Sequence, residues 1–168
     1  MEACVYFSDN FFSAGRTDIY NEEKEMVGSL NLKSAFSSSV DVEDTNGEIV
    51  VQGYFPIFSN KWSVQQTKGE ELGKVKTGFS FFKKRFRYES KNQSLEIESP
   101  AMSKEYTMTD KSGVEVATFR KVSGVFQSAA FELKNHTSSI STEELISVVM
   151  GVNAIEKRRR STAHGTPT

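Results

Sequence analysis

The sequence predicts an all-β fold with one helix: a closed antiparallel barrel of about twelve strands around a buried, hydrophobic C-terminal helix. Short segments in which apolar and polar residues alternate fill most of the 168 residues, and this period of two is typical of strands with one buried face. Turn-forming pairs such as Asn46-Gly47 separate these segments. The last long segment differs, because its apolar residues are nearly continuous.

The alternation is clear at Leu95 and Ile97, which interleave with Glu96 and Glu98. Each such segment is too short for a helix and is rich in Val, Ile, Phe, Tyr and Thr, as expected of strands. The predicted strands lie near 3–7, 16–21, 26–33, 39–43, 48–55, 61–67, 72–81, 85–90, 94–98, 103–109, 114–121 and 129–135. Twelve strands in one small domain would leave exposed edges, so we expect them to close into a barrel.

The predicted helix begins at a capping box, with Ser141 as N-cap and Glu144 three residues later. Residues 145–155 are apolar on nearly every side of the helix, so we expect it to be buried all round, in the middle of the barrel. One domain would then cover residues 1–160. Residues 161–168 contain no large apolar side chain, and we expect them to form a disordered tail.

The overall charge is nearly balanced, with 21 Lys and Arg against 22 Asp and Glu. This balance excludes a globally basic nucleic-acid-binding protein, so no nucleic-acid partner is expected. The single cysteine, Cys4, excludes a framework of intramolecular disulfides. The first residues show neither the positive charge nor the apolar run of a signal peptide. We therefore expect a cytoplasmic protein, either free or peripheral at a membrane.

Residues that could carry catalysis or hold a metal are scarce. Cys4, His136, His164 and scattered carboxylates do not have the spacing of a zinc site. A glycine-rich phosphate loop is absent, as is a recognisable set of nucleophile, base and orienting group. We therefore expect no enzymatic activity, no metal and no cofactor.

The strongest basic cluster follows the predicted strand 72–81. Its members are Lys83, Lys84, Arg85 and Arg87. Phe79 and Phe81 continue the alternation of that strand, and the alternation then changes parity, so a turn near 82–84 would place the cluster at a hairpin tip or barrel rim. Such cations either bind an anionic head group or keep a turn solvated.

A second basic cluster ends the predicted helix and consists of Lys157, Arg158, Arg159 and Arg160. These residues either bind lipid head groups or form a solvated helix end, where positive charge suits the helix dipole. Two aromatic features also have two interpretations. Phe11 and Phe12 form either a lip for a ligand or a plug over the barrel mouth, and Trp62 is either an interfacial anchor or a cover for the barrel end.

Three stretches of the chain resemble the tubby C-terminal-like superfamily, and within it the LURP-one-related proteins and their bacterial relatives. They are DNFFSAGRTDIYNE at 9–22, TNGEIVVQGYFPIFSNKWSV at 45–64 and ELISVVMGVNAIEKR at 144–158. The likeness covers roughly residues 3–157, and it lies in the overall pattern, without a catalytic signature. It implies a closed antiparallel barrel around a central helix.

The resemblance implies function less directly. Tubby-like domains are associated with phosphoinositide head groups, and the similar phospholipid scramblases act at membranes, but fold alone does not determine function. We therefore expect a non-enzymatic domain that binds anionic phospholipid or phosphoinositide head groups through the two basic clusters. The alternative is a protein-interaction or scaffold module without lipid binding. The oligomeric state is not predicted.

Overall fold

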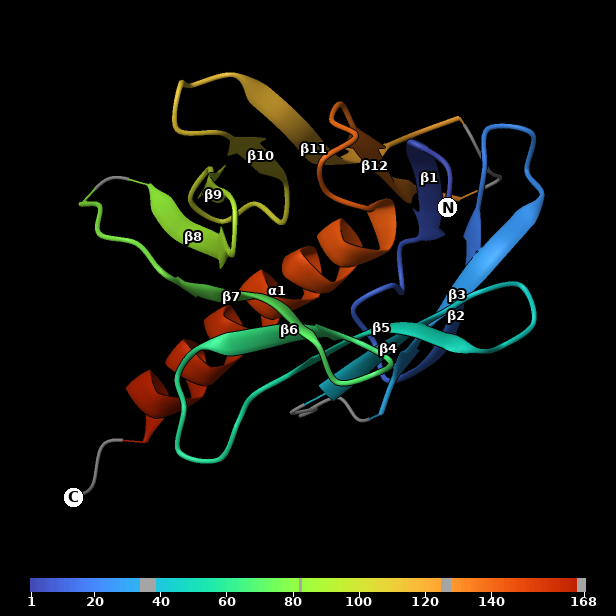
Figure 1. Ribbon diagram of the computed structural model, residues 1–168. Helices are drawn as coiled ribbons and strands as arrows, with labels where there is room; N and C mark the ends of the chain where they lie inside the picture. The colour runs from blue at the N-terminus through green and yellow to red at the C-terminus, as the bar shows by residue number, and fades with distance from the viewer. Residues whose placement is uncertain (34–38, 82, 125–127, 166–168) are drawn as a thin grey trace.

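The computed structural model describes residues 1–33, 39–81, 83–124 and 128–165. Twelve strands precede one helix (Figure 1). The elements are β1 (Cys4–Ser8), β2 (Gly15–Tyr20), β3 (Met26–Leu32), β4 (Ser39–Glu43), β5 (Ile49–Tyr54), β6 (Trp62–Gln66), β7 (Glu71–Thr77), β8 (Lys84–Ser90), β9 (Ser94–Ser99), β10 (Tyr106–Thr109), β11 (Glu115–Val122), β12 (Ala130–Asn135) and α1 (Thr142–His164). The predicted number and order of elements are confirmed.

Every strand pairs antiparallel with its neighbour in the chain, and β1 pairs with β12 to close the barrel. The closing pair runs from Cys4 opposite Lys134 to Ser8 opposite Ala130. Closure leaves no sheet edge without a partner strand. Because the strands form a simple meander, alternate connections lie at opposite ends of the barrel.

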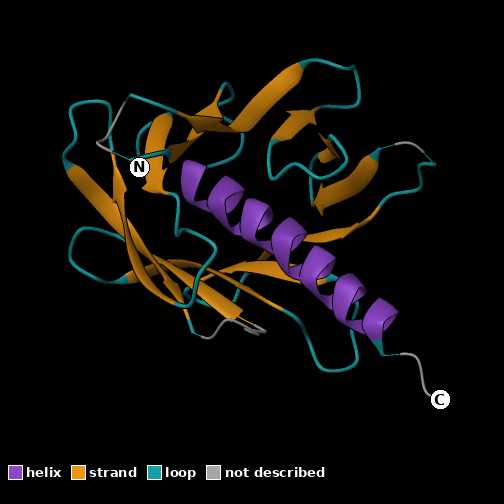
Figure 2. Ribbon diagram, turned by 180° about the vertical axis from the view of Figure 1, so that it is seen from behind, coloured by secondary structure: helices purple, strands orange, loops and turns teal. Residues whose placement is uncertain are grey.

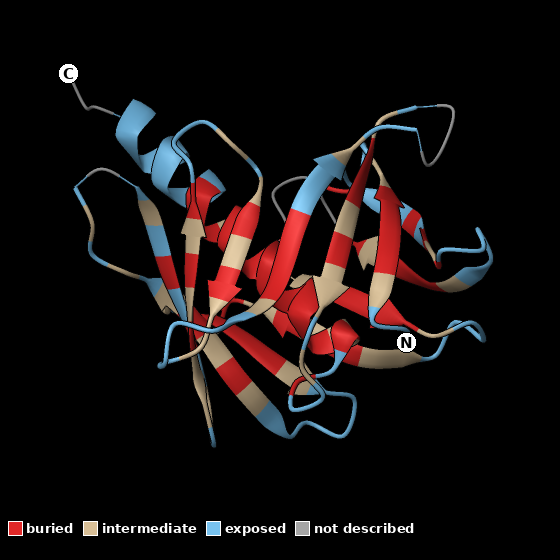
Figure 3. Cartoon of the chain, turned by 90° about the horizontal axis from the view of Figure 1, so that it is seen from above, coloured by how far each residue is buried: buried red, intermediate tan, exposed pale blue. Residues whose placement is uncertain are grey.

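The helix runs through the barrel, as Figure 2 shows, and packs chiefly against β4 to β7. Its N-cap is as predicted: the Ser141 hydroxyl accepts a hydrogen bond from the Glu144 backbone N–H at 3.1 Å. The residues from Leu145 to Val152 are buried on every side, and Figure 3 shows this buried part in red. The core is therefore formed by the inner faces of the strands around the apolar helix, as the sequence predicts.

The predicted tail at 161–168 is wrong in its first residues, because α1 continues to His164. Once a helix exists, each further residue costs little, and the Thr162 hydroxyl also donates to the Arg158 carbonyl at 3.1 Å. The last turns extend beyond the barrel and are exposed. The rest of the predicted tail, 166–168, lies outside the described residues.

The predicted strand 72–81 is too long, because β7 ends at Thr77. The Gly78 N–H donates to the Arg85 carbonyl at 2.8 Å, and the chain then turns away from the sheet. Phe79 and Phe81 consequently lie in the connection and are 80% and 83% exposed.

Within the described ranges, no helix is long and apolar enough to cross a bilayer. The same part of the chain contains no group of three or more His, Cys, Asp or Glu side chains placed to hold a metal ion.

Candidate functional site

The end of the barrel from which α1 emerges differs from the opposite end; we call it the helix-exit end. The connections that follow β1, β3, β5, β7, β9 and β11 lie here. In Figure 1 the connections β5–β6 and β7–β8 flank the projecting helix. Lys157 on α1 donates to the Phe12 carbonyl, and Arg158 donates to the Ser59 carbonyl, each at 3.1 Å. These bonds hold the emerging helix to the β1–β2 and β5–β6 connections.

Exposed large apolar side chains are concentrated at the helix-exit end. Among the described residues, five of seven such side chains lie there: Ile57, Phe58, Phe79, Phe81 and Met102. The other two, Met26 and Val114, belong to the opposite end and are less exposed. Scattered exposed apolar residues are normal on a protein surface, but a cluster on the tips of three neighbouring connections indicates a contact surface.

Two of these side chains are held in an unusual backbone conformation. Phe58 has φ of 59° and Met102 has φ of 69°, in the left-handed region that bulky residues rarely adopt. Phe79 and Phe81 pack edge to face, with ring centroids 4.9 Å apart, yet both remain exposed. The fold therefore presents these apolar groups outward without using them in its own core.

Charge is distributed as unevenly as the apolar tips. The connections and helix turns of the helix-exit end carry eight cationic side chains, Lys33, Lys61, Lys83, Lys104, Lys157, Arg158, Arg159 and Arg160, against the three carboxylates Asp9, Glu105 and Glu156. Two of these cations, Lys33 and Lys83, form ion pairs with carboxylates of neighbouring strands. The connections and N-terminus at the opposite end carry four, Lys24, Lys68, Lys91 and Lys111, against the eight carboxylates Glu2, Glu22, Glu23, Glu25, Asp44, Glu48, Glu70 and Asp110. The net charge of −1 thus conceals a strong separation of charge.

The first predicted basic cluster is largely neutralised by carboxylates. Arg85 and Arg87 lie in β8, opposite Glu98 and Glu96 of β9, and form cross-strand ion pairs with them at 2.6 and 2.5 Å. Lys83 also pairs with Glu98, at 3.1 Å, and its hydrogen bond is the main reason that the pKa of Glu98 lies below its ordinary value. The sequence predicts a hairpin tip or the barrel rim for this cluster: Lys83 lies in the β7–β8 connection, whereas Lys84, Arg85 and Arg87 lie along β8, which begins at Lys84.

Lys84 differs from its neighbours because it shares the inward face of β8 with Phe86 and Tyr88. Its ammonium group reaches α1 and forms an ion pair with the buried Glu156 at 3.0 Å. Lys84 therefore joins strand to helix within the fold, and its charge is not directed at solvent.

The second predicted basic cluster is exposed on the last turns of α1. Arg160 lies 3.9 Å from Glu156, whereas no carboxylate of the described residues forms an ion pair with Lys157, Arg158 or Arg159. Desolvation, reinforced by the nearby charge of Lys104, lowers the pKa of Lys157. Lys157, Arg158 and Arg159 therefore supply positive charge that no ion pair of the described residues compensates, beside the apolar tips.

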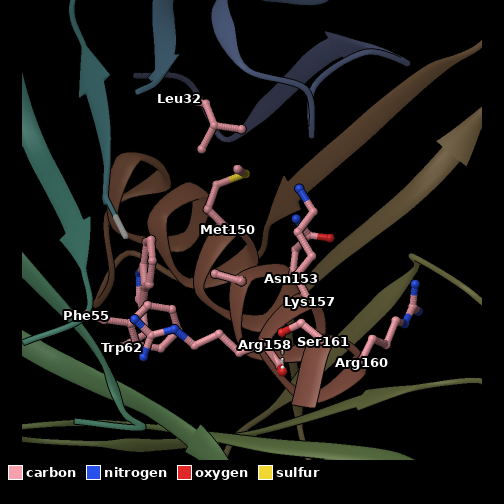
Figure 4. A pocket seen from close by; sticks show the side chains of 10 residues that line it. Leu32, Phe55, Trp62, Met150, Asn153, Lys157, Arg158, Arg160 and Ser161 are labelled. Carbon is pink, nitrogen blue, oxygen red and sulfur yellow. Dashed lines mark hydrogen bonds between the residues drawn. The ribbon is translucent and has the colours of Figure 1, made fainter. Parts of the chain in front are cut away.

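A cavity of about 490 Å³ opens between α1 and the β5–β6 side of the barrel (Figure 4). Its apolar wall is formed by Leu32, Phe55, Trp62, Met150 and Ala154. Its polar side is formed by Asn153, Lys157, Arg158, Arg160 and Ser161. Figure 4 shows Arg158 reaching across to Phe55, and the guanidinium carbon lies 3.5 Å from the centre of that ring.

The aromatic residues singled out in the sequence are mainly structural. Phe11 and Phe12 are 0% and 6% exposed and pack with Phe119 and Phe131, so the interpretation as a plug is confirmed. Trp62 is 1% exposed and is therefore a core residue, although one side of it lines the cavity.

Sequence comparison finds no matching family model and no curated protein that matches significantly. Structural comparison finds a protein from Arabidopsis thaliana whose X-ray structure superposes with a TM-score of 0.59. The match covers 89% of this chain and 90% of that chain, at 12% sequence identity. At this identity the likeness shows that the two proteins share a fold.

Sequence reasoning missed the apolar tips and the cavity. Alternation along the chain predicts Phe79 and Phe81 in a strand, and no pattern in the sequence distinguishes Phe58. For the first basic cluster, the sequence does contain a signal of its ion pairs. Glu96 and Glu98 of β9 follow the same alternation as Arg85 and Arg87 of β8, and this pattern predicts ion pairs across the two strands.

Proposed function

We propose that this protein is a peripheral membrane-binding module that docks on anionic phospholipid through its helix-exit end. The observation that carries the proposal is the coincidence, at one end of the barrel, of exposed apolar tips and uncompensated cations. Apolar side chains on loop tips gain free energy by entering the headgroup region, and each nearby cation contributes about 1 kcal/mol of attraction to an anionic surface. Either feature alone would be a weaker membrane signal.

The location of the cations decides which basic cluster the proposal uses. The carboxylates of Glu96 and Glu98 already compensate Arg85 and Arg87, so moving these arginines to a membrane would gain little. Lys157, Arg158 and Arg159 have no such partner among the described residues. The resemblance of the sequence to tubby-like domains, which are associated with phosphoinositides, adds support for an anionic lipid.

The test is co-sedimentation with vesicles of phosphatidylcholine, with and without phosphatidylserine, at low and physiological salt. We expect the protein to pellet only with phosphatidylserine vesicles, and less at higher salt. At about 1 kcal/mol per charge, Lys61→Glu with Arg159→Glu should weaken binding by at least about 25-fold. Phe79→Ser with Phe81→Ser should weaken binding by about tenfold or more, because two rings no longer enter the lipid.

The matched control is Lys24→Glu with Lys68→Glu, which makes the same change in net charge at the opposite end of the barrel. This variant should bind vesicles as the wild type does. Equal loss in both charge variants would show that only net charge matters. Absence of any vesicle binding would overturn the proposal and leave a protein-interaction role for the apolar tips.

A further inference from the structure

The cavity beside the exposed part of α1 combines an apolar interior with a cationic mouth. Met150, Ala154 and Arg158 follow one another at intervals of four residues, so they lie on one face of the helix. Leu32, Phe55 and Trp62 face them from the barrel side. The volume of about 490 Å³ is within the range of small-molecule sites.

The cations at the mouth retain unused capacity to bind an anion. Arg158 donates one hydrogen bond to the Ser59 carbonyl and lies over the Phe55 ring, which leaves most of its five N–H groups available. Lys157 is bonded to the Phe12 carbonyl. Burial, and then the charge of Lys104, lowers the pKa of Lys157, and a bound anion would oppose both effects.

We infer that this cavity binds a single-chain anionic amphiphile, with the acyl chain against Trp62 and Met150 and the head group on Arg158 and Lys157. A small anion alone would leave the apolar wall in contact with water. A neutral hydrocarbon would leave both cations without an anionic partner. The inference goes beyond vesicle docking, because it concerns one molecule taken into the fold and not a membrane surface.

Trp62 provides a direct readout, because it is the only tryptophan of the chain and lines the cavity. Titration with dodecanoate below its micellar concentration should change the tryptophan fluorescence saturably. Burying a methylene contributes about 0.8 kcal/mol, so affinity should increase about fourfold with each methylene from octanoate to dodecanoate. Dodecyl phosphate tests whether a phosphate head group, as in a monoacyl phospholipid, binds more tightly than the carboxylate of a free fatty acid.

Two variants separate the chain site from the head-group site. Ala154→Phe should fill the cavity and weaken dodecanoate binding by at least tenfold. Arg158→Gln should weaken dodecanoate and dodecyl phosphate by about fivefold or more and leave dodecanol unaffected, because dodecanol has no charge. If Ala154→Phe does not fold, Arg158→Gln and the chain-length series still decide the question.

The matched control is Phe79→Ser with Phe81→Ser, which changes the tips and leaves the cavity intact. This variant should bind dodecanoate normally while losing vesicles, and Ala154→Phe should show the converse, so each proposal can fail independently. A fluorescence change that does not saturate, does not depend on chain length, or persists in Ala154→Phe would overturn the inference.

Discussion

Phe58 combines two properties that seldom occur together in one residue. Its side chain is fully exposed, and its φ of 59° lies in the left-handed region. That conformation costs an L-amino acid about 1–2 kcal/mol, and nothing in the packing of Phe58 repays the cost. The turn closed by the Ser59 N–H and the Pro56 carbonyl, 3.0 Å apart, sets this backbone conformation. The exposed ring takes no part in the core and is left for a contact outside the fold.

This interpretation predicts opposite effects of Phe58→Asn on stability and on binding. Asn adopts the left-handed conformation readily, so the free energy of unfolding should rise by about 1 kcal/mol. Binding to phosphatidylserine vesicles should fall by about tenfold, because the ring is lost. Chemical denaturation and co-sedimentation measure the two effects, and a parallel loss of both would mean that Phe58 serves the fold.

Glu144 is a buried carboxyl group that affects stability in a pH-dependent way. Burial raises the pKa of Glu144 above its ordinary value of 4.5, although the hydrogen bond from the Tyr88 hydroxyl acts in the opposite direction. The folded state therefore binds more protons than the unfolded state between the ordinary and the raised pKa. Because of this difference, the free energy of unfolding falls as pH rises through that interval.

Glu144→Gln keeps an acceptor for Tyr88 and removes the buried charge. We expect the variant to be more stable than the wild type at neutral pH and to lose this part of the pH dependence, as measured by denaturation from about pH 4 to pH 8. Glu23→Gln, on an exposed connection, serves as the control. If the wild type did not lose stability relative to the variant as pH rises through this range, the raised pKa would be contradicted.

The position of α1 depends on how closely it approaches one strand. The Trp62 indole lies against Gly53 of β5 and Gly151 of α1, and a Cβ at either glycine would come closer to the ring than real Cβ atoms approach. Two glycines are therefore needed to admit the largest core side chain between helix and barrel. One face of the cavity depends on the same indole.

Gly151→Ala tests this packing, because helix propensity and packing predict opposite outcomes. Alanine should stabilise an isolated helix by about 1 kcal/mol, whereas crowding against Trp62 should cost about 1–3 kcal/mol. We expect a net loss of unfolding free energy, with a change in tryptophan fluorescence. Ser161→Ala, on the exposed part of α1, should not destabilise the protein, and a stabilised Gly151→Ala would contradict the packing described here.

The strands and the helix could be predicted from the sequence wherever residues adjacent in the chain determine the structure. Neighbouring residues determine the alternation along a strand such as β9 and the cap at Ser141. The sequence therefore predicts the strands and the start of the helix correctly. The outward exposure of Phe79 depends on where β7 stops pairing, which is a property of the barrel end. The cavity requires Leu32, Phe55 and Met150 to meet across three elements, and spacing along the chain does not encode this.

The whole molecule is polarised along the barrel. One end carries apolar tips and an excess of cations, and the opposite end carries an excess of carboxylates. An anionic surface would attract the first end and repel the second, which would orient the barrel before any apolar side chain makes contact. The membrane-binding proposal therefore makes a geometric claim about which end faces the lipid.

The most direct test is an environment-sensitive fluorophore attached at one cysteine in a Cys4→Ser background. The label is placed either at Phe81→Cys, at the helix-exit end, or at Ser112→Cys, in the β10–β11 connection at the opposite end. On addition of phosphatidylserine vesicles, we expect the label at 81 to shift to the blue and the label at 112 to stay unchanged. A shift at 112 alone, an equal shift at both positions, or no shift would contradict docking through the helix-exit end.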